Sequence, residues 1–320
     1  MSLTVSVVVC AYTAERWDLI KDAIASLQAQ TRPPIETVLC IDHNPMLSEQ
    51  CRQQWPAEQY PDLAIVDNRY DGRLGSARNT ACELVRGDII AFLDDDARAA
   101  PDWLANLSRS YESDASAMAI GGAPLPIYGA ARPAWLPDEF NWVFGCAYRG
   151  LPSHRAPVRH LIGANMSVRR SALVRLGGFH SDNHDDMDLC HRVARVYGQQ
   201  AVVYDPTVRV DHYVSANRLT WDYFWRRCFY VNRGKVVAFK DMEAAGNIMA
   251  EIRFGLRSLF ISAPRYVAHL RPAGFMKAGA VVVGLALAAA GHLSGRVQLA
   301  LGTATPSLTH GFRPRYGVAE

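Results

Sequence analysis

Three consecutive carboxylates, Asp94, Asp95 and Asp96, close the apolar run 88–93 and are the residues of this sequence best suited to chemistry. Adjacent like charges repel, so such a run is costly unless a cation lies beside it. A divalent ion held by carboxylate oxygens, with its other positions open to phosphate oxygens, would answer that charge. The end of a buried strand is also where open α/β sheets bind ligands. The alternative is a solvated acidic turn, because acidic runs are common at such places.

A second acidic cluster follows later, where Asp185, Asp186 and Asp188 open a predicted helix. The helix dipole favours carboxylates in a first turn, so capping is the simple interpretation, and we expect it for Asp188. Dipole and capping bonds also keep a carboxylate ionised, as a general base for a hydroxyl must be. His212 ends a strand-like run from 208 and is either a structural histidine or a metal ligand.

The elements that position these residues show an alternation of strand-like and helical patterns, which is typical of βαβ units and a parallel sheet. This pattern over the first hundred residues predicts a parallel-sheet, nucleotide-binding half. The Gly- and Pro-rich stretch 121–157 predicts long loops over a cleft, unless its aromatic residues only fill a loop core. The expected strands are 5–10, 37–41, 64–67 and 88–93, and the expected helices are 17–30 and about 75–85.

Composition narrows the class of protein. A chain of 320 residues, 49% hydrophobic and 20% charged, can bury a full core and is not disordered. Its seven cysteines are odd in number and scattered without a C-x-x-C pair, which argues against a disulfide framework and a zinc site. The first residues lack the basic region of a signal peptide. We therefore expect a cytoplasmic protein.

The charge is distributed unevenly. Residues 218–320 carry fourteen Lys and Arg against five Asp and Glu, a net charge of +9, whereas the whole chain has +3 and the first 217 residues therefore −6. The acidic front argues against nucleic-acid binding. The basic and aromatic back suits an anionic membrane surface or an anionic substrate.

Within the basic back half, the apolar run 278–293 has sixteen residues. A spanning helix needs about eighteen or more, so a helix on the membrane surface or a re-entrant helix is expected. The flanking cations Arg271, Lys277 and Arg296 suit anionic headgroups, and the location would be the inner face of the cell membrane. The alternative is a packed dimerisation helix. Residues from 302 onward are expected to form a loose end.

Eight short motifs stand in a fixed order along the chain. They are Val-Val-Val-Cys-Ala-Tyr-Thr at 7–13, Ile-Asp-His-Asn at 41–44, Gly-Ser-Ala-Arg-Asn at 75–79, Leu-Asp-Asp-Asp at 93–96, Gly-Ala-Asn-Met at 163–166 with Arg-Arg at 169–170, Gly-Gly-Phe at 177–179, Asp-Asp at 185–186 and His212. In this order they resemble the family 2 glycosyltransferases of the GT-A fold, which move sugars from nucleoside diphosphate donors. The resemblance runs from Val5 to about Lys235.

Two further segments, 11–17 and 132–150, are similar to bacterial and archaeal members that act on lipid-linked or polysaccharide acceptors, including glucuronosyltransferases of glucosyl-dolichyl phosphate. The resemblance implies a GT-A catalytic domain over 1–217, a Rossmann-like mixed sheet flanked by helices. Its nucleotide-binding half would be 1–100 and its acceptor-binding half 101–217. A basic and aromatic helical extension against the membrane would follow over 218–300, with a tail at 301–320. Homo-oligomers are possible with such an extension.

The resemblance also assigns roles to residues of the two acidic clusters. Asp94 and Asp96 would bind Mn²⁺ or Mg²⁺, with His212 completing the metal shell. Asp186 would be the general base. The first position of the family's acidic pair holds the shorter Asp185, which leaves the assignment of the base open between the two. The nucleotide-sugar would lie against Ala11, Tyr12, Asp42, Arg78, Asp94, Asp95, Asn165, Arg226 and Arg227, with Asp42 accepting from a uracil-like base edge and Arg78 approaching the base or the diphosphate.

The expected activity is an inverting transfer from a nucleoside diphosphate sugar, expected to be a UDP-sugar, to a hydroxyl of a lipid-linked saccharide or a polysaccharide, as in cell-envelope synthesis. Two alternatives remain. A nucleotidyltransferase would carry a Gly-rich basic loop after the first strand, and 11–15 is not such a loop. A non-catalytic sugar- or lipid-binding subunit would have lost the metal-binding and base residues, all of which are present.

Overall fold

The computed structural model describes residues 3–182, 184–238, 248–268, 270–304 and 312–315. The chain forms two compact units. The first consists of 1–125, 152–212 and 307–320, and the second of 126–151 and 213–306. The segment 126–151 therefore groups with the back of the chain rather than with the predicted acceptor-binding half.

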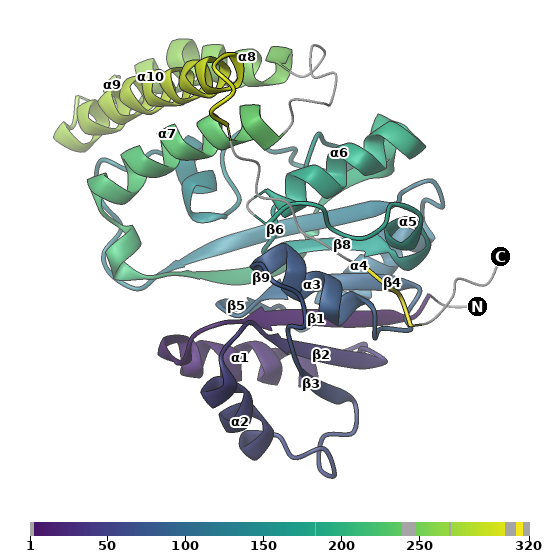
Figure 1. Cartoon of the computed structure of the whole chain (residues 1–320). Coiled ribbons are helices and arrows are strands. Elements are labelled where there is room, and N and C mark those ends of the chain that lie inside the picture. The colour runs from purple at the N-terminus through teal and green to yellow at the C-terminus, as the bar shows by residue number, and fades with distance from the viewer. Residues whose placement is uncertain (1–2, 183, 239–247, 269, 305–311, 316–320) are drawn as a thin grey trace. The chain divides into compact units, whose positions relative to one another are not determined.

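A mixed sheet is the centre of the first unit (Figure 1). Its strands follow the order β3-β2-β1-β4-β8-β6-β9-β5, and β7 pairs with β9 beside this path. The first four in this order are mutually parallel, whereas β8 pairs antiparallel with both β4 and β6, and β5 antiparallel with β9. The bounds are β1 Val5–Ala11, β2 Glu36–Ile41, β3 Leu63–Asp67, β4 Ile89–Asp94, β5 Ala97–Ala99, β6 Ala119–Tyr128, β7 Ala156–Pro157, β8 Asn165–Arg169 and β9 Val202–Val214.

Helices cover both faces of this sheet because its central strands are apolar on both sides. Val7 and Val9 of β1 join a core with α1 and α4, whereas Val8 joins a second core with α3, α5 and α6. The helices are α1 Trp17–Gln28, α2 Pro45–Gln54, α3 Leu74–Cys82, α4 Trp103–Glu112, α5 Arg170–Arg175 and α6 Asp185–Tyr197, with short 3₁₀ turns η1 Ala14–Arg16 and η3 Gln199–Ala201.

The strands and helices predicted over the first hundred residues are confirmed within a few residues. One helix was missed: α2 begins after Asn44, whose side chain accepts a hydrogen bond from the Leu47 amide, and Pro45 holds its first position. These are start signals for a helix, but its low apolar content hid it. The loop prediction for 121–157 was wrong in part, since β6 extends to Tyr128 and a 3₁₀ helix, η2 Asp138–Phe144, occupies its middle.

The second unit is helical, apart from the ends of β6 and β9. It contains η2, η4 Ala216–Arg218, α7 Trp221–Ala238, α8 Ile248–Arg257, the π-helical turn η5 Ser258–Ser262, α9 Ala263–Val267 and α10 Pro272–Ala300. The basic and aromatic helical extension expected over 218–300 includes α7, whose sequence is rich in aromatic and basic residues. The hydrophobic core of the second unit joins aromatic residues of η2 and α7, such as Phe140 and Phe224, to Val281 of α10.

The helix that contains the apolar run 278–293 is longer than the run itself. The helix α10 has 29 residues, because Lys277 and Arg296 interrupt the apolar sequence without ending the helix. By length and composition this helix could cross a membrane. Only 22% of its most apolar window is buried, so it is not a core helix of the protein. Part of the predicted loose end is held in place. The backbone amides of Arg313 and Arg315 donate hydrogen bonds to Glu83, which directly follows α3.

Candidate active site

Three parallel strands deliver polar residues to one edge of the sheet. Cys10 of β1 pairs in register with Asp94 of β4, and Ala11 with Ile41 of β2. Because the strands are parallel, the residues that follow β1 and β2, Tyr12 and Asp42, emerge at the same edge as Asp94. This is the edge at which open α/β sheets bind ligands.

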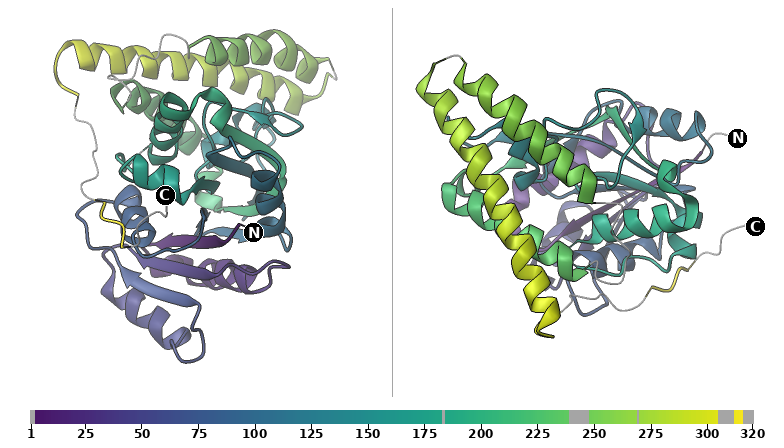
Figure 2. Two further views of the ribbon diagram at one scale, coloured as in Figure 1. Left: turned by 90° about the vertical axis from the view of Figure 1, so that its right-hand side faces the viewer. Right: turned by 90° about the horizontal axis from the view of Figure 1, so that it is seen from above.

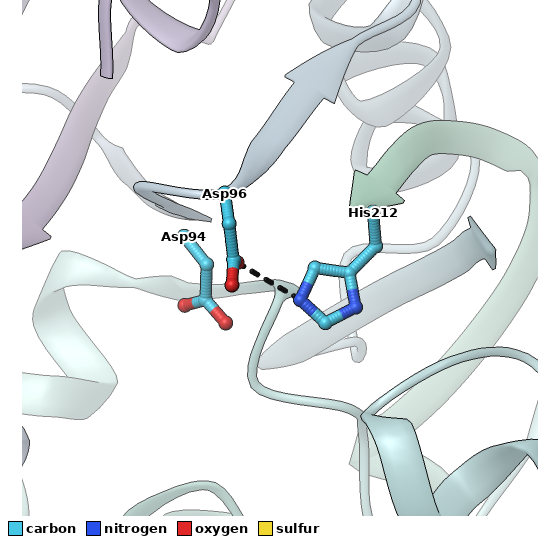
Figure 3. A group of neighbouring side chains, drawn as sticks. All are labelled: Asp94, Asp96 and His212. Carbon is cyan, nitrogen blue, oxygen red and sulfur yellow. Dashed lines mark hydrogen bonds and ion pairs between the residues drawn. The ribbon is translucent and has the colours of Figure 1, made fainter. Parts of the chain in front are cut away.

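His212 is brought to this edge by an antiparallel pairing. The chain turns sharply after Asp94 and starts β5 at Ala97, which pairs with His212 of β9. Asp94, Asp96 and His212 thus each offer a ligand atom, and the three atoms lie within 4.8 Å of one another (Figure 3). The Nε2 atom of His212 is 2.9 Å from Oδ1 of Asp96. Two carboxylates and an imidazole at this spacing form a ligand set that suits a divalent cation.

Asp95 points to an arginine instead. Arg16 Nη1 lies 2.6 Å from Asp95 Oδ1 and 3.1 Å from Asp96 Oδ2. Burial raises the pKa of Asp95 to about 7. Arg16 acts in the opposite direction, whereas the like charges of Asp96 and Asp94 add to the rise. The predicted contact of Asp95 with the nucleotide stays a prediction, since its side chain is 4% exposed.

The predicted base-binding residues are fixed by short polar contacts. Asn68 Nδ2 donates to Asp42 Oδ1 at 2.7 Å, which leaves the second carboxylate oxygen of Asp42 for another donor. Asn44 Nδ2 donates to the Tyr12 carbonyl at 3.0 Å, and the Tyr12 ring is 56% exposed. Ala11 is buried, so only its backbone could take part in binding.

Arg78 has a different environment from the one predicted. Its side chain is buried, forms an ion pair with Asp185, and donates through Nη2 to Asp94 at 3.1 Å and to the Gly163 carbonyl at 3.0 Å. Its guanidinium also lies over the ring of Phe92. Arg78 thus links the strand-end acids to the acids of α6, and its predicted approach to the base or diphosphate stays a prediction that these contacts do not favour.

The two acids at the start of α6 are not equivalent. Asp185 is buried against Arg78, whereas Asp186 is partly exposed and accepts from backbone amides, from Gly163 at 3.0 Å and from Met187 at 2.7 Å. Burial raises the pKa of Asp185 to about 6 against the attraction of Arg78, and Asp186 and Asp94 add to the rise. Burial also raises the pKa of Asp186, although the Met187 amide, Arg78 and the Gly163 amide act in the other direction. The arrangement therefore favours Asp186 as the carboxylate that can meet a hydroxyl.

Three other predicted residues have polar contacts outside this cluster. Asn165 is buried, accepts from Trp103 Nε1 and donates to the Val208 carbonyl, both at 2.9 Å, so its amide supports the fold. Arg226 and Arg227 belong to the second unit, where Arg226 pairs with Asp222 at 2.8 Å and Arg227 donates to the Val143 carbonyl. Ligand binding by all three stays a prediction.

Sequence reasoning missed the residues that hold this site in place. Arg16 and Asn68 contact predicted site residues, and Asn68 could have been found as the polar residue that directly follows β3. The cap expected from Asp188 was wrong, since Asp188 pairs with Arg192 at 2.7 Å. Asp182 has the capping role instead, but at the start of α3, where it accepts from the amides of Arg73 and Ser76 at 3.1 Å. No local spacing signals a cap from so distant a residue.

Comparison with known proteins now decides the family. The model of the family described as Glycosyl transferase family 2 matches residues 6–177, more than half of the chain. The chain belongs to glycosyltransferase family 2. The predicted GT-A fold is confirmed as well, because this glycosyltransferase matches a mannosyltransferase from Pyrobaculum calidifontis solved with GDP-Man and Mn²⁺ over 95% of this chain and 80% of that one, with a TM-score of 0.58 and 22% identity.

Two further relatives extend the comparison. The glycosyltransferase is 33% identical to a glucosyl-dolichyl phosphate glucuronosyltransferase of Haloferax volcanii over 244 aligned residues. The alignment covers 73% of this chain and 77% of that protein. The structure of GalNAc-T7 with UDP, GalNAc and Mn²⁺ matches 83% of this chain and 58% of that one, with a TM-score of 0.51 and 16% identity. Two neighbours in fold thus bind Mn²⁺, and the family 2 chain has an Asp-Asp-His cluster suited to such an ion.

Proposed function

We propose that this glycosyltransferase moves a sugar from a UDP-sugar to a hydroxyl of a lipid-linked saccharide or a polysaccharide, with inversion at the anomeric carbon. The observation that supports it most is the placement of Asp94, Asp96 and His212 at the strand edge that also carries Asp42. Asp42 would accept a hydrogen bond from the uracil edge through the oxygen that Asn68 leaves open.

The chemistry follows from the residues around that edge. Asp94, Asp96 and His212 would hold Mn²⁺ or Mg²⁺, which when bound would offset the charge that develops on the departing diphosphate. Asp186 would take the proton of the acceptor hydroxyl while its oxygen forms a bond to the anomeric carbon. The bond from that carbon to the diphosphate oxygen breaks on the opposite face. A single displacement of this kind inverts the centre and needs no covalent sugar intermediate.

The acceptor and the location are proposed from the relatives and from the second unit. The Haloferax relative acts on glucosyl-dolichyl phosphate, as its name states, which makes a lipid-linked saccharide the first acceptor to test and a glucuronosyl group the first donor sugar. A lipid-linked acceptor and the basic back half together favour peripheral attachment to the inner face of the cell membrane. Arg226 and Arg227 would serve a phosphate of the donor or the lipid. A homo-oligomer would be compatible with this arrangement.

The test is Mn²⁺-dependent release of nucleoside diphosphate from a panel of UDP-, GDP- and TDP-sugars that includes UDP-glucuronate. We expect turnover of a UDP-sugar by wild-type protein and loss of turnover in Asp96→Ala. Asp211→Ala is the matched control, because Asp211 neighbours His212 on the same strand but pairs with Arg98. Turnover of only a GDP- or TDP-sugar would overturn the choice of nucleotide. Failure of every donor, with membrane lipid extract present and no nucleotide binding by calorimetry, would overturn the enzymatic function.

A further inference from the structure

The long helix α10 is packed on one face through glycines. A Cβ atom on Gly291 would lie 2.1 Å from the Phe229 carbonyl oxygen of α7, and one on Gly295 would lie 2.6 Å from that of Arg233. These distances are shorter than any real contact, so the helices approach backbone to backbone. The side chains of α10 on the side opposite these glycines therefore point away from α7.

The opposite face of α10 is an exposed apolar stripe. Exposed residues recur along it at helical spacing, and the large apolar side chains are separated by small residues such as Ala286, Ala289 and Ala290. The large residues of the stripe are at least 40% exposed, and Leu293 reaches 64% and Leu301 71%. Its large residues are Phe275, Met276, Val282, Val283, Leu293, Val297 and Leu301. A continuous apolar surface of this length is unusual in a protein that has no partner.

The neighbouring helical segment adds to this surface. Ile252, Leu256 and Phe260 follow one another at four-residue steps along α8 and η5, and Phe260 is 69% exposed. This segment lies beside α10 (Figure 2), since a Cβ atom on Gly255 would lie 3.7 Å from Leu285. We call the apolar stripe of α10 together with Ile252, Leu256 and Phe260 the docking face.

Cations accompany the docking face. Residues 248–304 contain six Lys and Arg but a single acid, Glu251, which gives them a net charge of +5. Five of the cations are exposed: Arg253, Arg257, Arg265, Arg271 and Arg296. Apolar side chains flanked by cations match an anionic lipid surface, where the chains enter the interface and the cations meet headgroups. A second copy of the chain would bring the same positive charge and would be repelled.

We propose that the docking face inserts into the interface of an anionic membrane with α10 lying in the plane of the surface. A crossing orientation conflicts with the glycine packing, because α7 would have to enter the hydrocarbon with α10. Charged residues in hydrocarbon are costly, and α7 carries Arg226, Arg227, Arg233 and Lys235. The proposal rests on the proposed function for its purpose, since a lipid-linked acceptor would be met at that surface, and on the helices of the second unit for its geometry.

Flotation of the full chain with vesicles tests the attachment. The vesicles contain phosphatidylcholine alone or equal parts of phosphatidylcholine and phosphatidylglycerol. We expect the wild type to float with the anionic vesicles, and binding to fall at least about tenfold for Leu293→Gln/Val297→Gln, which removes two apolar side chains from the interface. Arg265→Gln/Arg271→Gln should weaken binding about tenfold or more, because each cation near an anionic surface contributes measurably. Val196→Gln is the control, since Val196 is 43% exposed on α6 of the other unit and its change should leave flotation unaltered.

Depth measurements test the orientation. A fluorescent label is attached to a single new cysteine at Val283 or Val297, because six native cysteines are buried and Cys10 is partly buried. The two positions are fourteen residues apart, or roughly 21 Å along a helix. We expect equal, shallow depths from quenching by lipids brominated at different carbons. Labels that differ in depth by most of that length would show a crossing helix and overturn the proposal.

Other outcomes also overturn it. The wild type failing to float would exclude the docking face as a membrane surface. Sedimentation showing a dimer that dissociates in Leu293→Gln/Val297→Gln, without vesicle binding, would assign the face to a second copy. Donor turnover measured on the same protein keeps the two proposals apart: turnover without flotation overturns only the docking face, and flotation without turnover of any donor overturns only the proposed function.

Discussion

The acidic turn at Asp94–Asp96 and the acidic pair Asp185–Asp186 both place adjacent carboxylates at the end of an element, but their neighbours differ. In the turn, Arg16 pairs with Asp95 and Asp96, and the imidazole of His212 lies beside Asp96. In the pair, Asp185 is matched by Arg78, and Asp186 is held by two backbone amides.

This difference separates the two kinds of chemistry that a glycosyltransferase needs. The turn keeps an excess of negative charge, which a divalent cation would offset. In the pair, Arg78 balances the charge of Asp185 and only the charge of Asp186 remains. Backbone donors stabilise the ionised form of Asp186. Arg78 joins the two groups, since it lies 3.1 Å from Asp94 while paired with Asp185. One buried side chain therefore links the candidate metal ligands to the helix end that carries the proposed base.

Removal of the proposed base should have the largest effect. Asp186→Asn keeps the shape and the contact with the Gly163 amide but cannot accept the proton of the acceptor, so kcat should fall by about 10²–10⁴-fold. Calorimetry should show nucleotide and Mn²⁺ binding within about twofold of wild type. Asp188→Asn is the control in the same helical turn. Equal losses of kcat in both variants would contradict the assignment.

The metal side of the comparison should respond in binding as well as in rate. Asp96→Ala removes a ligand, and we expect kcat to fall by roughly 10²–10³-fold, with a loss of the Mn²⁺-dependent part of UDP affinity. Chelation of the metal from wild-type protein should reproduce that loss of affinity. UDP titrations by calorimetry, with and without Mn²⁺, measure both effects. Unchanged Mn²⁺ dependence in Asp96→Ala would place the ion elsewhere.

The sequence predicted the strand-end half of this comparison better than the helix half. The register of parallel strands follows from apolar runs, so the meeting of Tyr12, Asp42 and Asp94 at one edge could be expected. The choice between Asp185 and Asp186 could not, because it depends on where Arg78 points. That direction is set by packing against Phe92 and by the cap that Asp182 gives to the start of α3. The contact with Asp182 joins residues 106 positions apart and leaves no local pattern.

Breaking the link between the two groups should cost stability. Arg78→Met leaves Asp185 buried without its cation, and loss of one partner of a buried pair costs about 3–5 kcal/mol of unfolding free energy. Arg78→Met/Asp185→Asn should recover part of this cost, because the unpaired charge is then removed. Urea unfolding followed by circular dichroism measures all three proteins. A double variant no more stable than Arg78→Met would mean that the unpaired charge of Asp185 is not the cause of the lost stability.

The smallest expected effect is a shift of the pH profile. A base is inactive when protonated, so kcat should fall as the pH decreases through the pKa of Asp186, which burial raises above that of an ordinary aspartate. Burial is the main cause that raises the pKa of Asp185 to about 6, and the like charge of Asp186 adds to the rise. Asp185→Asn removes one of these like charges and frees Arg78 to attract Asp186, and both changes lower the pKa of Asp186. The acid limb of the kcat profile should therefore move to lower pH in Asp185→Asn, and an unmoved limb would show that the titration observed belongs to another group.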